Sequence, residues 1–404
     1  MLADLPHPPM SGNHLRDLQN LRVLSLLGYD VRIVAGVART DPCLVGPIGT
    51  LCASQHVPGY VPGAAARIRR VLAVMRGALA TPARDPWAEN HTRAHFEATV
   101  LRAARRIQPD VILVRSLFGH LVEPLRATTR LVILDAHDSQ VLVARALSTH
   151  ATRSSRLGLR VREVAAARAE ASYQQADELW VPSRREQSYF ARRTPGLATV
   201  IVPNGIEPEP LSHPRDSGNA ELLLIAGFGW PPNVAAAETL VEELLPRVRR
   251  RHPNAHVTLV GRDLSPRLID RWRNAPVRWL GTVESTGPYL RRAAAVVFAP
   301  PSSAATGTPL KIAEALAAGL PLVATPVASE ALGLEPGVHA VIDYDLDVLA
   351  DGICRIIEDA SFADRLRDAG RSWVVDNLSS ASIAARLRRE SVVASTPESA
   401  RAHP

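Results

Sequence analysis

Short apolar runs alternate with helical stretches along nearly the whole chain, and this alternation restricts the possible folds more than any other feature of the sequence. The runs are rich in β-branched and aliphatic residues and end in polar or turn residues, which is typical of buried strands. Strands are expected at residues 30–35, 111–114, 131–134, 179–181, 199–202, 222–226, 257–260, 277–280, 295–299 and 321–324. Strands that alternate with helices form parallel sheets with helices on both faces. The sequence therefore predicts an α/β fold built from doubly wound, Rossmann-like sheets.

A break interrupts this pattern near the middle of the chain. Residues 203–205, Pro-Asn-Gly, are a turn signal, and residues 207–219 are rich in Pro, Ser, Asp and Gly, as linkers are. With 404 residues, the chain is long enough for two domains with separate cores. We predict two domains that face each other across a cleft, where ligands bind outside the carboxyl ends of the strands. The predicted segments are an N-terminal domain at 1–203, a C-terminal domain at 204–378, and a closing part at 379–404 with a helix that crosses back to the first domain and then a frayed tail.

The beginning of the chain departs from the doubly wound pattern. Such a domain should open with a buried strand, but only residues 1–5 precede the turn-rich segment at 6–13. The first strand is therefore either very short or cut by the start of this sequence.

The composition excludes several classes of protein. Apolar residues make up 46% of the chain, yet no apolar run approaches the roughly 18 residues that a membrane-spanning helix needs. The N-terminus lacks the basic and apolar regions of a secretory signal. Three cysteines, Cys43, Cys52 and Cys354, are too few and too scattered for a disulfide framework or a zinc site. We expect a cytoplasmic location.

The net charge of +7 comes almost entirely from arginine, and Lys311 is the only lysine. Such a charge suits an anionic substrate, a membrane surface or nucleic acid, or it simply solvates the surface. Nucleic acid is not expected, because no basic run is interleaved with aromatic residues. The basic helix expected at 64–76 could contact a membrane peripherally, although a solvated face is the commoner explanation for its arginines.

The single lysine lies where a helix should begin. Thr308 is a suitable N-cap and Pro309 suits the first helical position, which places Lys311 in the first turn. A cation there opposes the helix dipole, whereas a bound phosphate would meet the dipole, free backbone N–H groups and the ammonium together. Glu314 lies one turn further on the same face among apolar neighbours, so its carboxylate needs either ribose hydroxyls or an arginine as partner. Gly319 should end this helix.

The stretch from Thr306 to Thr325 resembles the donor-binding segment of glycosyltransferase family 4, a family of retaining enzymes with the GT-B fold. This chain carries it in the form Gly-Thr-x-x-Lys-x-x-Glu. The other matching segments are Val202–Ile206 at the family's hinge, Ala226–Asn233, Val260–Arg262 and Leu280–Val283 in the donor domain, and Ser11–Asn13 and Asp135–Asp138 in the first domain.

The resemblance implies transfer from a nucleotide-diphosphate sugar with retention of configuration and without a metal or other cofactor. It assigns His137, Lys311 and Glu314 to catalysis. The implied donor contacts are Gly227, Phe228, Gly229, Gly261, Arg262, Thr282, Val283, Thr306, Gly307, Thr308, Lys311 and Glu314. Ser11, Gly12 and Asn13 would form a loop beside the phosphates and the acceptor, which is a small molecule, a glycan or a lipid.

Two departures from the family pattern leave other functions open. Thr306 stands where the broader family often has a first glutamate, and residues 230–233 replace the usual basic residues after the glycine-rich loop. A catalytically silent GT-B paralogue that supports a partner enzyme, or a GT-B enzyme with related nucleotide-sugar chemistry, therefore remains an alternative.

Two patterns could indicate a metal site, but each has a simpler explanation. The Asp-x-Asp spacing at Asp343 and Asp345 precedes a helix, where aspartates act as caps. His137 lies between two aspartates, but no second histidine stands at metal-ligand spacing. No metal site is expected.

Overall fold

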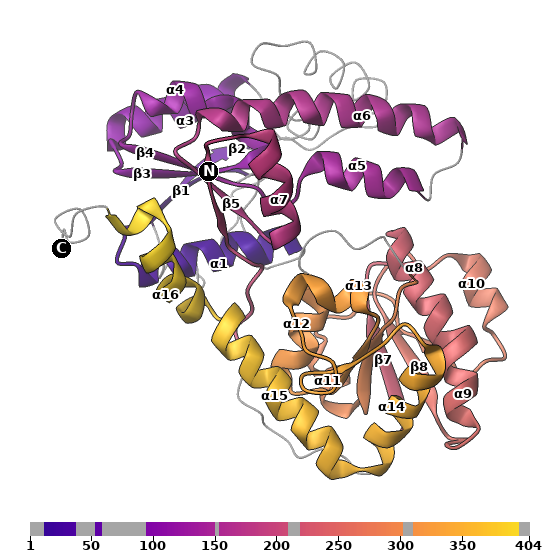
Figure 1. Ribbon diagram of the computed structural model, residues 1–404. Coiled ribbons are helices and arrows are strands. Elements are labelled where there is room, and N and C mark those ends of the chain that lie inside the picture. The colour runs from indigo at the N-terminus through magenta and orange to yellow at the C-terminus, as the bar shows by residue number, and fades with distance from the viewer. Residues whose placement is uncertain are drawn as a thin grey trace. The chain divides into compact units, whose positions relative to one another are not determined.

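The computed structural model describes residues 12–37, 53–58, 94–149, 153–208, 219–301 and 310–395. The chain divides into two compact units (Figure 1). Unit 1 comprises Met1–Gly205 and Ser380–Pro404, and unit 2 comprises Ile206–Ser379.

Unit 1 consists of parallel strands separated by helices. Its elements are α1 (Gly12–Leu26), β1 (Arg32–Val37), β2 (Ala53–Pro58), α3 (Ala94–Ile107), β3 (Val111–Arg115), η3 (Ser116–Leu121), α4 (Val122–Arg126), β4 (Leu131–Asp135), α5 (Gln140–Thr149), α6 (Arg153–Ala171), η4 (Ser172–Gln175), β5 (Glu178–Val181), α7 (Arg184–Arg193), β6 (Ala198–Ile201), α16 (Ser380–Glu390) and η7 (Val392–Ser395). The strands form two parallel sheets, β1-β2 and β3-β4-β5-β6.

Alternate residues of the four-stranded sheet enter two different cores, because successive side chains of a strand point to opposite faces. Leu134 in β4 packs with α3, α4 and α7, whereas Ile133 and Trp180 pack with α1 and α16 on the other face. Figure 1 shows α3 and α4 on one side of these strands and α1 and α16 on the other. Both faces are therefore buried, which explains why the strands are continuous apolar runs rather than alternating ones.

The helix α16 packs on unit 1, although it follows the whole of unit 2 in the chain. Ile383 and Leu387 are buried against Val23 of α1 and against Leu27, which directly follows α1. The next segment is tied to the same unit by the Tyr29 hydroxyl, which donates to the carbonyl of Val393 at 2.5 Å.

Unit 2 is a six-stranded parallel sheet of order β12-β11-β10-β7-β8-β9. Its elements are β7 (Glu221–Ile225), α8 (Pro231–Glu238), η5 (Thr239–Leu244), α9 (Leu245–Arg249), β8 (His256–Val260), α10 (Pro266–Arg271), β9 (Val277–Trp279), α11 (Gly287–Arg292), β10 (Ala295–Phe298), α12 (Leu310–Ala317), β11 (Leu322–Ala324), α13 (Pro326–Ser329), η6 (Glu330–Leu332), β12 (Val341–Ile342), α14 (Leu346–Glu358) and α15 (Ala360–Leu378). The first strand, β7, lies at the centre between β8 and β10. This reversal of strand order opens a binding site at the carboxyl end of the sheet.

The ten strands expected between residues 30 and 324 are all present, and two further strands in the described residues were not expected. β2 has the sequence Ala-Ser-Gln-His-Val-Pro, which contains no apolar run, and β12 is only two residues long. Both form by pairing with a neighbouring strand, β1 and β11 respectively. The expected strand at residues 1–5 and the expected basic helix at 64–76 lie outside the described residues.

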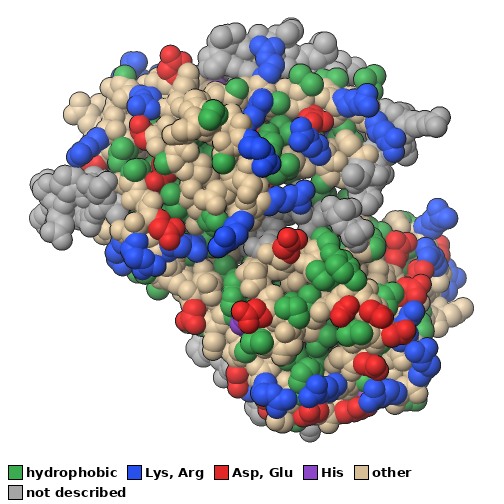
Figure 2. Space-filling view, in the orientation of Figure 1, with side chains coloured by type: hydrophobic (Ala, Val, Ile, Leu, Met, Phe, Trp, Pro, Cys, Tyr) green, Lys and Arg blue, Asp and Glu red, His purple; other side chains and the backbone are tan. Residues whose placement is uncertain are grey.

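In the described residues, no helix is both long and apolar enough to cross a membrane. On the face shown in Figure 2, basic side chains spread over unit 1 with few acidic ones among them, whereas both signs are mixed over unit 2.

Candidate functional site

The loops that follow β7, β8 and β9 are joined to one another at the carboxyl edge of the unit 2 sheet. The backbone N–H of Phe228 donates to the carbonyl of Arg262 at 2.9 Å, and that of Gly261 donates to the carbonyl of Gly281 at 2.8 Å. Phe228 is buried, while Gly227 and Gly229 are exposed beside it. Three segments that the sequence placed at the donor therefore lie side by side.

Gly261 is required by this arrangement. Its φ is +138°, and a Cβ atom there would lie 1.8 Å from the carbonyl oxygen of Ala226. The close approach of the β7 and β8 chain ends thus depends on the absence of a side chain.

Lys311 lies in the first turn of α12, and its ammonium donates a hydrogen bond to the side-chain oxygen of Asn233 in α8. The amide of Asn233 in turn donates to the carbonyl of Gly227 at 2.8 Å. The ammonium also lies 4.1 Å from the ring centroid of Phe298, at the end of β10, within the range of a cation–π interaction. The ammonium is therefore held by α8, β10 and α12 together.

Burial disfavours the charge on both ionisable groups of α12. It lowers the pKa of Lys311 to about 8, although the nearby carboxylate of Glu314 opposes this. Burial likewise raises the pKa of Glu314, and Lys311 partly offsets the effect. In the described part of the chain the ammonium makes no ion pair and the carboxylate has no hydrogen-bond partner. Two polar groups one turn apart are thus left with capacity for a ligand.

The C-terminal end of α12 follows the expected capping geometry. Gly319 has a φ of +69°, its N–H donates to the carbonyl of Leu316, and the N–H of Leu320 donates to that of Ala315. These two bonds form a Schellman motif. Thr306, Gly307 and Thr308, which were expected before α12, lie outside the described residues.

The remaining expected donor residues follow the ends of β8 and β9. Arg262 has a side chain that is 73% exposed, 3.4 Å from Asp263. Thr282 is exposed, and Val283 packs against the core of the unit. Arg262 and Thr282 are therefore accessible to a ligand, whereas Val283 mainly supports its loop.

In unit 1, His137 belongs to a buried cluster at the carboxyl ends of β3 and β4. Its Nε2 atom lies 3.0 Å from a carboxylate oxygen of Asp135 and 3.2 Å from one of Asp17. Arg16 donates to Asp135 through Nε and Nη2, and Arg115 lies 3.2 Å from Asp17. Burial alone would raise the pKa of Asp135, but the positive charges of Arg16 and His137 hold it well below its ordinary value.

Arg16 also connects this cluster to residues 202–204, close to the point where the chain leaves unit 1 at Gly205. Its Nη1 atom donates to the carbonyl of Val202 at 2.7 Å and to the side-chain oxygen of Asn204 at 3.0 Å. Val202 and Asn204 belong to the segment that resembles the family's hinge. Both are therefore bound by the same buried Arg16 guanidinium that binds Asp135.

Asp17, Asp135 and His137 place three potential metal ligands within 4.8 Å of one another. Each carboxylate is already paired with an arginine, Asp135 with Arg16 and Asp17 with Arg115. The negative charge that would attract a cation is thus compensated, and the cluster suits an orienting role for the imidazole better than a metal site.

Several other expectations can be compared with the structure. Gly12 and Asn13 are the first residues of α1 and not loop residues, and Ser11 lies outside the described residues. Asp345 caps α14 by accepting from the N–H of Asp347, as expected for the Asp-x-Asp spacing. Burial and the charge of Glu186 raise the pKa of Asp138, next to His137, to about 6.

The partners of the candidate residues come from distant parts of the chain and were not predicted from the sequence. Asn233 and Phe298 hold Lys311 from 78 and 13 residues away, and Arg16 and Asp17 hold the Asp135–His137 pair. A polar residue in the first turn of the helix after the glycine-rich loop was the one available signal for Asn233. Nothing in the local sequence pointed to Arg16 or Asp17.

Comparison with known proteins agrees with this geometry. Residues 220–359 match the family model described as glycosyl transferases group 1. This range contains Asn233, Lys311 and Glu314, together with the loops after β7, β8 and β9. The matched range lies within unit 2.

The chain is also similar to solved structures over almost its whole length. Sucrose-phosphate synthase from Thermosynechococcus elongatus matches with a TM-score of 0.64 and 19% identity over 96% of both chains. Anabaena Alr3699/HepE, solved in complex with UDP and glucose, matches with a TM-score of 0.61 and 14% identity over 98% of both chains. The protein has the GT-B fold.

Curated relatives match a smaller part. Phosphatidyl-myo-inositol mannosyltransferases of Mycobacterium tuberculosis and Mycobacterium bovis are 26% identical over 194 residues, or 44% of this chain. The chain spans about half the length of these relatives, which share 50% of their length with it.

Proposed function

We propose that this protein is a glycosyltransferase that takes a sugar from a nucleotide-diphosphate donor bound to unit 2. The observation that best supports this proposal is the pair of Lys311 and Glu314 at the start of α12. In the described part of the chain, a half-buried lysine with a lowered pKa and a carboxylate without a hydrogen-bond partner lie one turn apart, beside the exposed glycines after β7. A diphosphate and a ribose would satisfy both groups at once.

The parts of the donor follow from this placement. The diphosphate lies at Lys311 and at the N-terminal end of α12, and Gly307 and Thr308 are candidates for further contacts with it. The ribose hydroxyls lie at Glu314, and the base lies against the loops that contain Arg262 and Thr282. The main catalytic effect is stabilisation of the charge that develops on the leaving diphosphate.

In unit 1 we assign His137 to the reacting sugar and to positioning of the acceptor. Asp135 and Asp17 lie within ion-pair distance of its Nε2 atom, and each carboxylate is also paired with an arginine. Gly12, Asn13 and Ser11 remain candidates for contacts with the acceptor and phosphates. The acceptor is a small molecule, a glycan or a lipid.

We further propose that transfer retains the configuration of the sugar and needs no metal. The Lys311 ammonium takes the position of a diphosphate counter-charge that a divalent cation supplies in other enzymes. The test is incubation with UDP-glucose, UDP-N-acetylglucosamine and GDP-mannose in EDTA without an acceptor, followed by NMR of the released sugar. We expect slow hydrolysis of one of these donors. The sugar released first should have the same anomeric configuration as it has in the donor. Release of the opposite anomer, or a strict metal requirement, would refute this part.

The replacement of an acid by Thr306 favours a second candidate, a silent GT-B paralogue that supports a partner enzyme. The same experiment separates the two. A silent paralogue binds a nucleotide sugar, measured as a raised melting temperature, but releases no sugar from any donor.

We also propose that unit 1 contacts a membrane peripherally through α6. In α6, Leu157 is 71% exposed, Val161 45% and Val164 62%, at helical spacing on one face. Arg160 and Arg168 are exposed beside them. An apolar stripe flanked by arginines suits an anionic lipid surface.

A further inference from the structure

Asn233 is a buried neutral side chain that joins Lys311 to the glycine-rich loop after β7. Only 7% of its surface is exposed. Its Oδ1 atom accepts a hydrogen bond from the Lys311 ammonium, and its Nδ2 atom donates to the carbonyl of Gly227 at 2.8 Å. An ammonium has no acceptor and a carbonyl has no donor, so an amide turned by a half rotation would lose both bonds. The amide therefore has one orientation, with its oxygen towards the lysine.

The backbone of Asn233 is held as well. The residue lies in the first turn of α8, and its N–H donates to the carbonyl of Trp230 at 3.0 Å. Pro231 and Pro232 come directly before it, and the fixed φ of proline suits the start of a helix. Because the backbone and the side chain are both restrained, the amide oxygen is a rigid acceptor for the ammonium.

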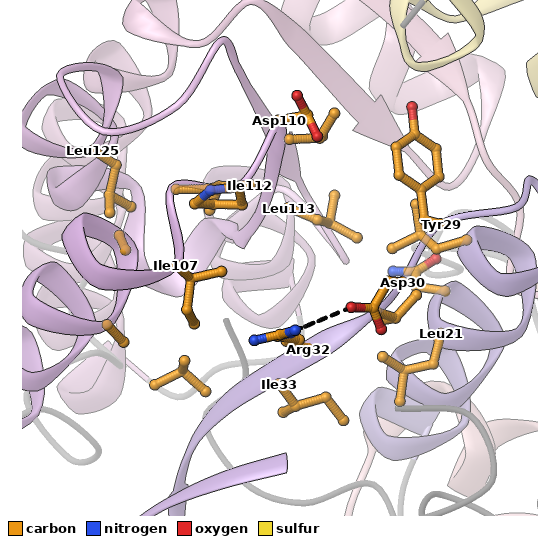
Figure 3. Close-up of a pocket in the computed structure, with 18 of the residues that line it drawn as sticks. Leu21, Tyr29, Asp30, Arg32, Ile33, Ile107, Asp110, Ile112, Leu113 and Leu125 are labelled. Atoms are coloured by element: carbon orange, nitrogen blue, oxygen red, sulfur yellow. Dashed lines mark hydrogen bonds and ion pairs between the residues drawn. The ribbon is translucent and has the colours of Figure 1, made fainter. Parts of the chain in front are cut away.

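A cation that pairs with a carboxylate has its charge compensated. Arg32 and Asp30 form such a pair at 3.2 Å beside a cavity of about 440 Å³ in unit 1 (Figure 3). Arg16 and Asp135 form another. The carboxylate in each pair offsets the attraction that the arginine would exert on an incoming anion.

The contacts of Lys311 are different, because they come from neutral groups. The Asn233 oxygen carries only the partial charge of an amide. The Phe298 ring, with its centroid 4.1 Å from the ammonium, offers only the negative face of its π system. In the part of the chain that the structure describes, Lys311 makes no ion pair, and Glu314 acts on it as a nearby charge. The ammonium is therefore held in place with its charge available.

We propose that Asn233 is a positioning residue for the nucleotide-diphosphate donor. Its neutral amide fixes the Lys311 ammonium at the start of α12 and leaves the positive charge free for the diphosphate. An aspartate at this position would also fix the ammonium but would compensate its charge, and an aliphatic residue would leave the ammonium unfixed. The inference rests on the proposed function, because it takes the donor diphosphate as the anion that Lys311 binds.

The pKa of Lys311 gives a direct test, because Lys311 is the only lysine in the chain. In protein made with isotope-labelled lysine, NMR then follows one side-chain signal. The pKa should be about 8 in the wild type. Asn233→Leu keeps a branched side chain without its oxygen, so the pKa should fall by about one unit. Asn233→Asp brings a negative charge to the ammonium, so the pKa should rise by at least about one unit.

Titration calorimetry with UDP and GDP at pH 7 separates the position of the ammonium from its charge. Asn233→Leu should weaken binding of the preferred nucleotide by at least about fivefold, because the ammonium loses a fixed acceptor. Asn233→Asp should weaken it by at least about tenfold, because the carboxylate compensates the charge that the diphosphate needs. This loss should occur although Lys311 is then more fully protonated.

Asn219→Asp is the matched control. Asn219 also bridges two backbone groups of unit 2, since its oxygen accepts from the N–H of Glu221 at 3.0 Å and its nitrogen donates to the carbonyl of Arg292. It precedes β7, whereas Asn233 follows that strand. This variant should leave both the pKa of Lys311 and the nucleotide affinity unchanged.

Two results would overturn the inference. The first is a Lys311 pKa that neither substitution moves, and the second is an Asn233→Asp variant that binds the nucleotide as tightly as the wild type. If Asn233→Leu does not fold, Asn233→Asp decides alone, because its side chain has almost the shape of asparagine. A failure of the proposed function looks different. The wild type then binds neither UDP nor GDP although the Lys311 pKa still responds to both substitutions, and Asn233 positions no donor group.

Discussion

Replacing Lys311 by glutamine should weaken binding of a nucleoside diphosphate by about 30-fold at pH 7. A hydrogen bond to a charged group contributes roughly 1.5–3 kcal/mol, which corresponds to about 10-fold to 150-fold in affinity. The value should lie inside this range because Asn233 and Phe298 already hold the ammonium, so little side-chain order is lost on binding.

The pH dependence of binding follows from the lowered pKa. The free protein holds Lys311 with a pKa of about 8, and a bound diphosphate favours the charged form and raises that pKa again. Binding above about pH 8 therefore requires uptake of a proton, and affinity should fall by up to about tenfold for each further pH unit. Below about pH 8, Lys311 is already charged in the free protein, so it adds no pH dependence to the affinity.

The same pKa makes a prediction about stability. A pKa of about 8 instead of 10.5 corresponds to about 3 kcal/mol that disfavours the charged lysine in the folded protein. The unfolded chain binds more protons between these two values, so stability should rise as the pH increases from about 8 to 10.5. Lys311→Met should remove that rise and should stabilise the unliganded protein at pH 7.

Titration calorimetry with UDP and GDP at pH 7, 8 and 9 measures the affinity, and two buffers of different ionisation enthalpy measure the proton uptake. Lys311→Arg should retain binding without the pH dependence, since a guanidinium stays charged. Arg365→Gln, which removes one exposed charge from α15, is the control for net charge. If Lys311→Gln binds as tightly as the wild type, or if affinity does not change between pH 8 and 9, the assignment of this helix terminus to a phosphate is wrong.

Three further predictions concern other parts of the molecule. Gly261→Ala should destabilise unit 2 by at least about 3 kcal/mol and abolish nucleotide binding, because a Cβ atom would clash with the Ala226 carbonyl oxygen. Denaturant unfolding monitored on unit 2 measures this loss of stability. An unchanged unfolding midpoint would contradict the geometry. Asp138 has a raised pKa of about 6, so its ionisation lowers stability as the pH rises from about 4 to 6. Asp138→Asn should stabilise the protein by up to about 3 kcal/mol at pH 7 and leave stability at pH 4 nearly unchanged. A loss of stability at pH 7 would show that the carboxylate is needed in its charged form. Leu157→Asp should reduce flotation with vesicles of anionic phospholipid several-fold, while Val375→Asp in unit 2 should not; equal flotation of both variants would remove α6 as the contact.

Local patterns were sufficient for most of the secondary structure. Strands buried on both faces must be apolar along their whole length, so runs such as Leu222 to Ala226 were recognisable without any tertiary information. β2 was not recognisable, because its polar sequence becomes a strand only through pairing with β1. Strand formation at such an edge depends on its neighbour and not on its own residues.

The positions of the candidate site residues could be predicted from the sequence, but their electrostatic properties could not. Lys311, Glu314 and Gly319 lie on one short helix, where the positions of caps, first-turn charges and i, i+3 neighbours follow from helix geometry alone. Their electrostatic state does not follow from it. The lowered pKa of Lys311 and the raised pKa of Glu314 arise from burial, which depends on segments far away in the chain.

The sequence by itself determined that this chain forms doubly wound parallel sheets and that one helix start combines a lone lysine with a glutamate. Both are properties of neighbouring residues, set by side-chain periodicity and helix capping. Only the tertiary structure decided that Asn233 and Phe298 hold the lysine and that arginines neutralise the carboxylates around His137. These contacts join residues from distant parts of the sequence, and their energies depend on burial and distance, which exist only once the chain has folded.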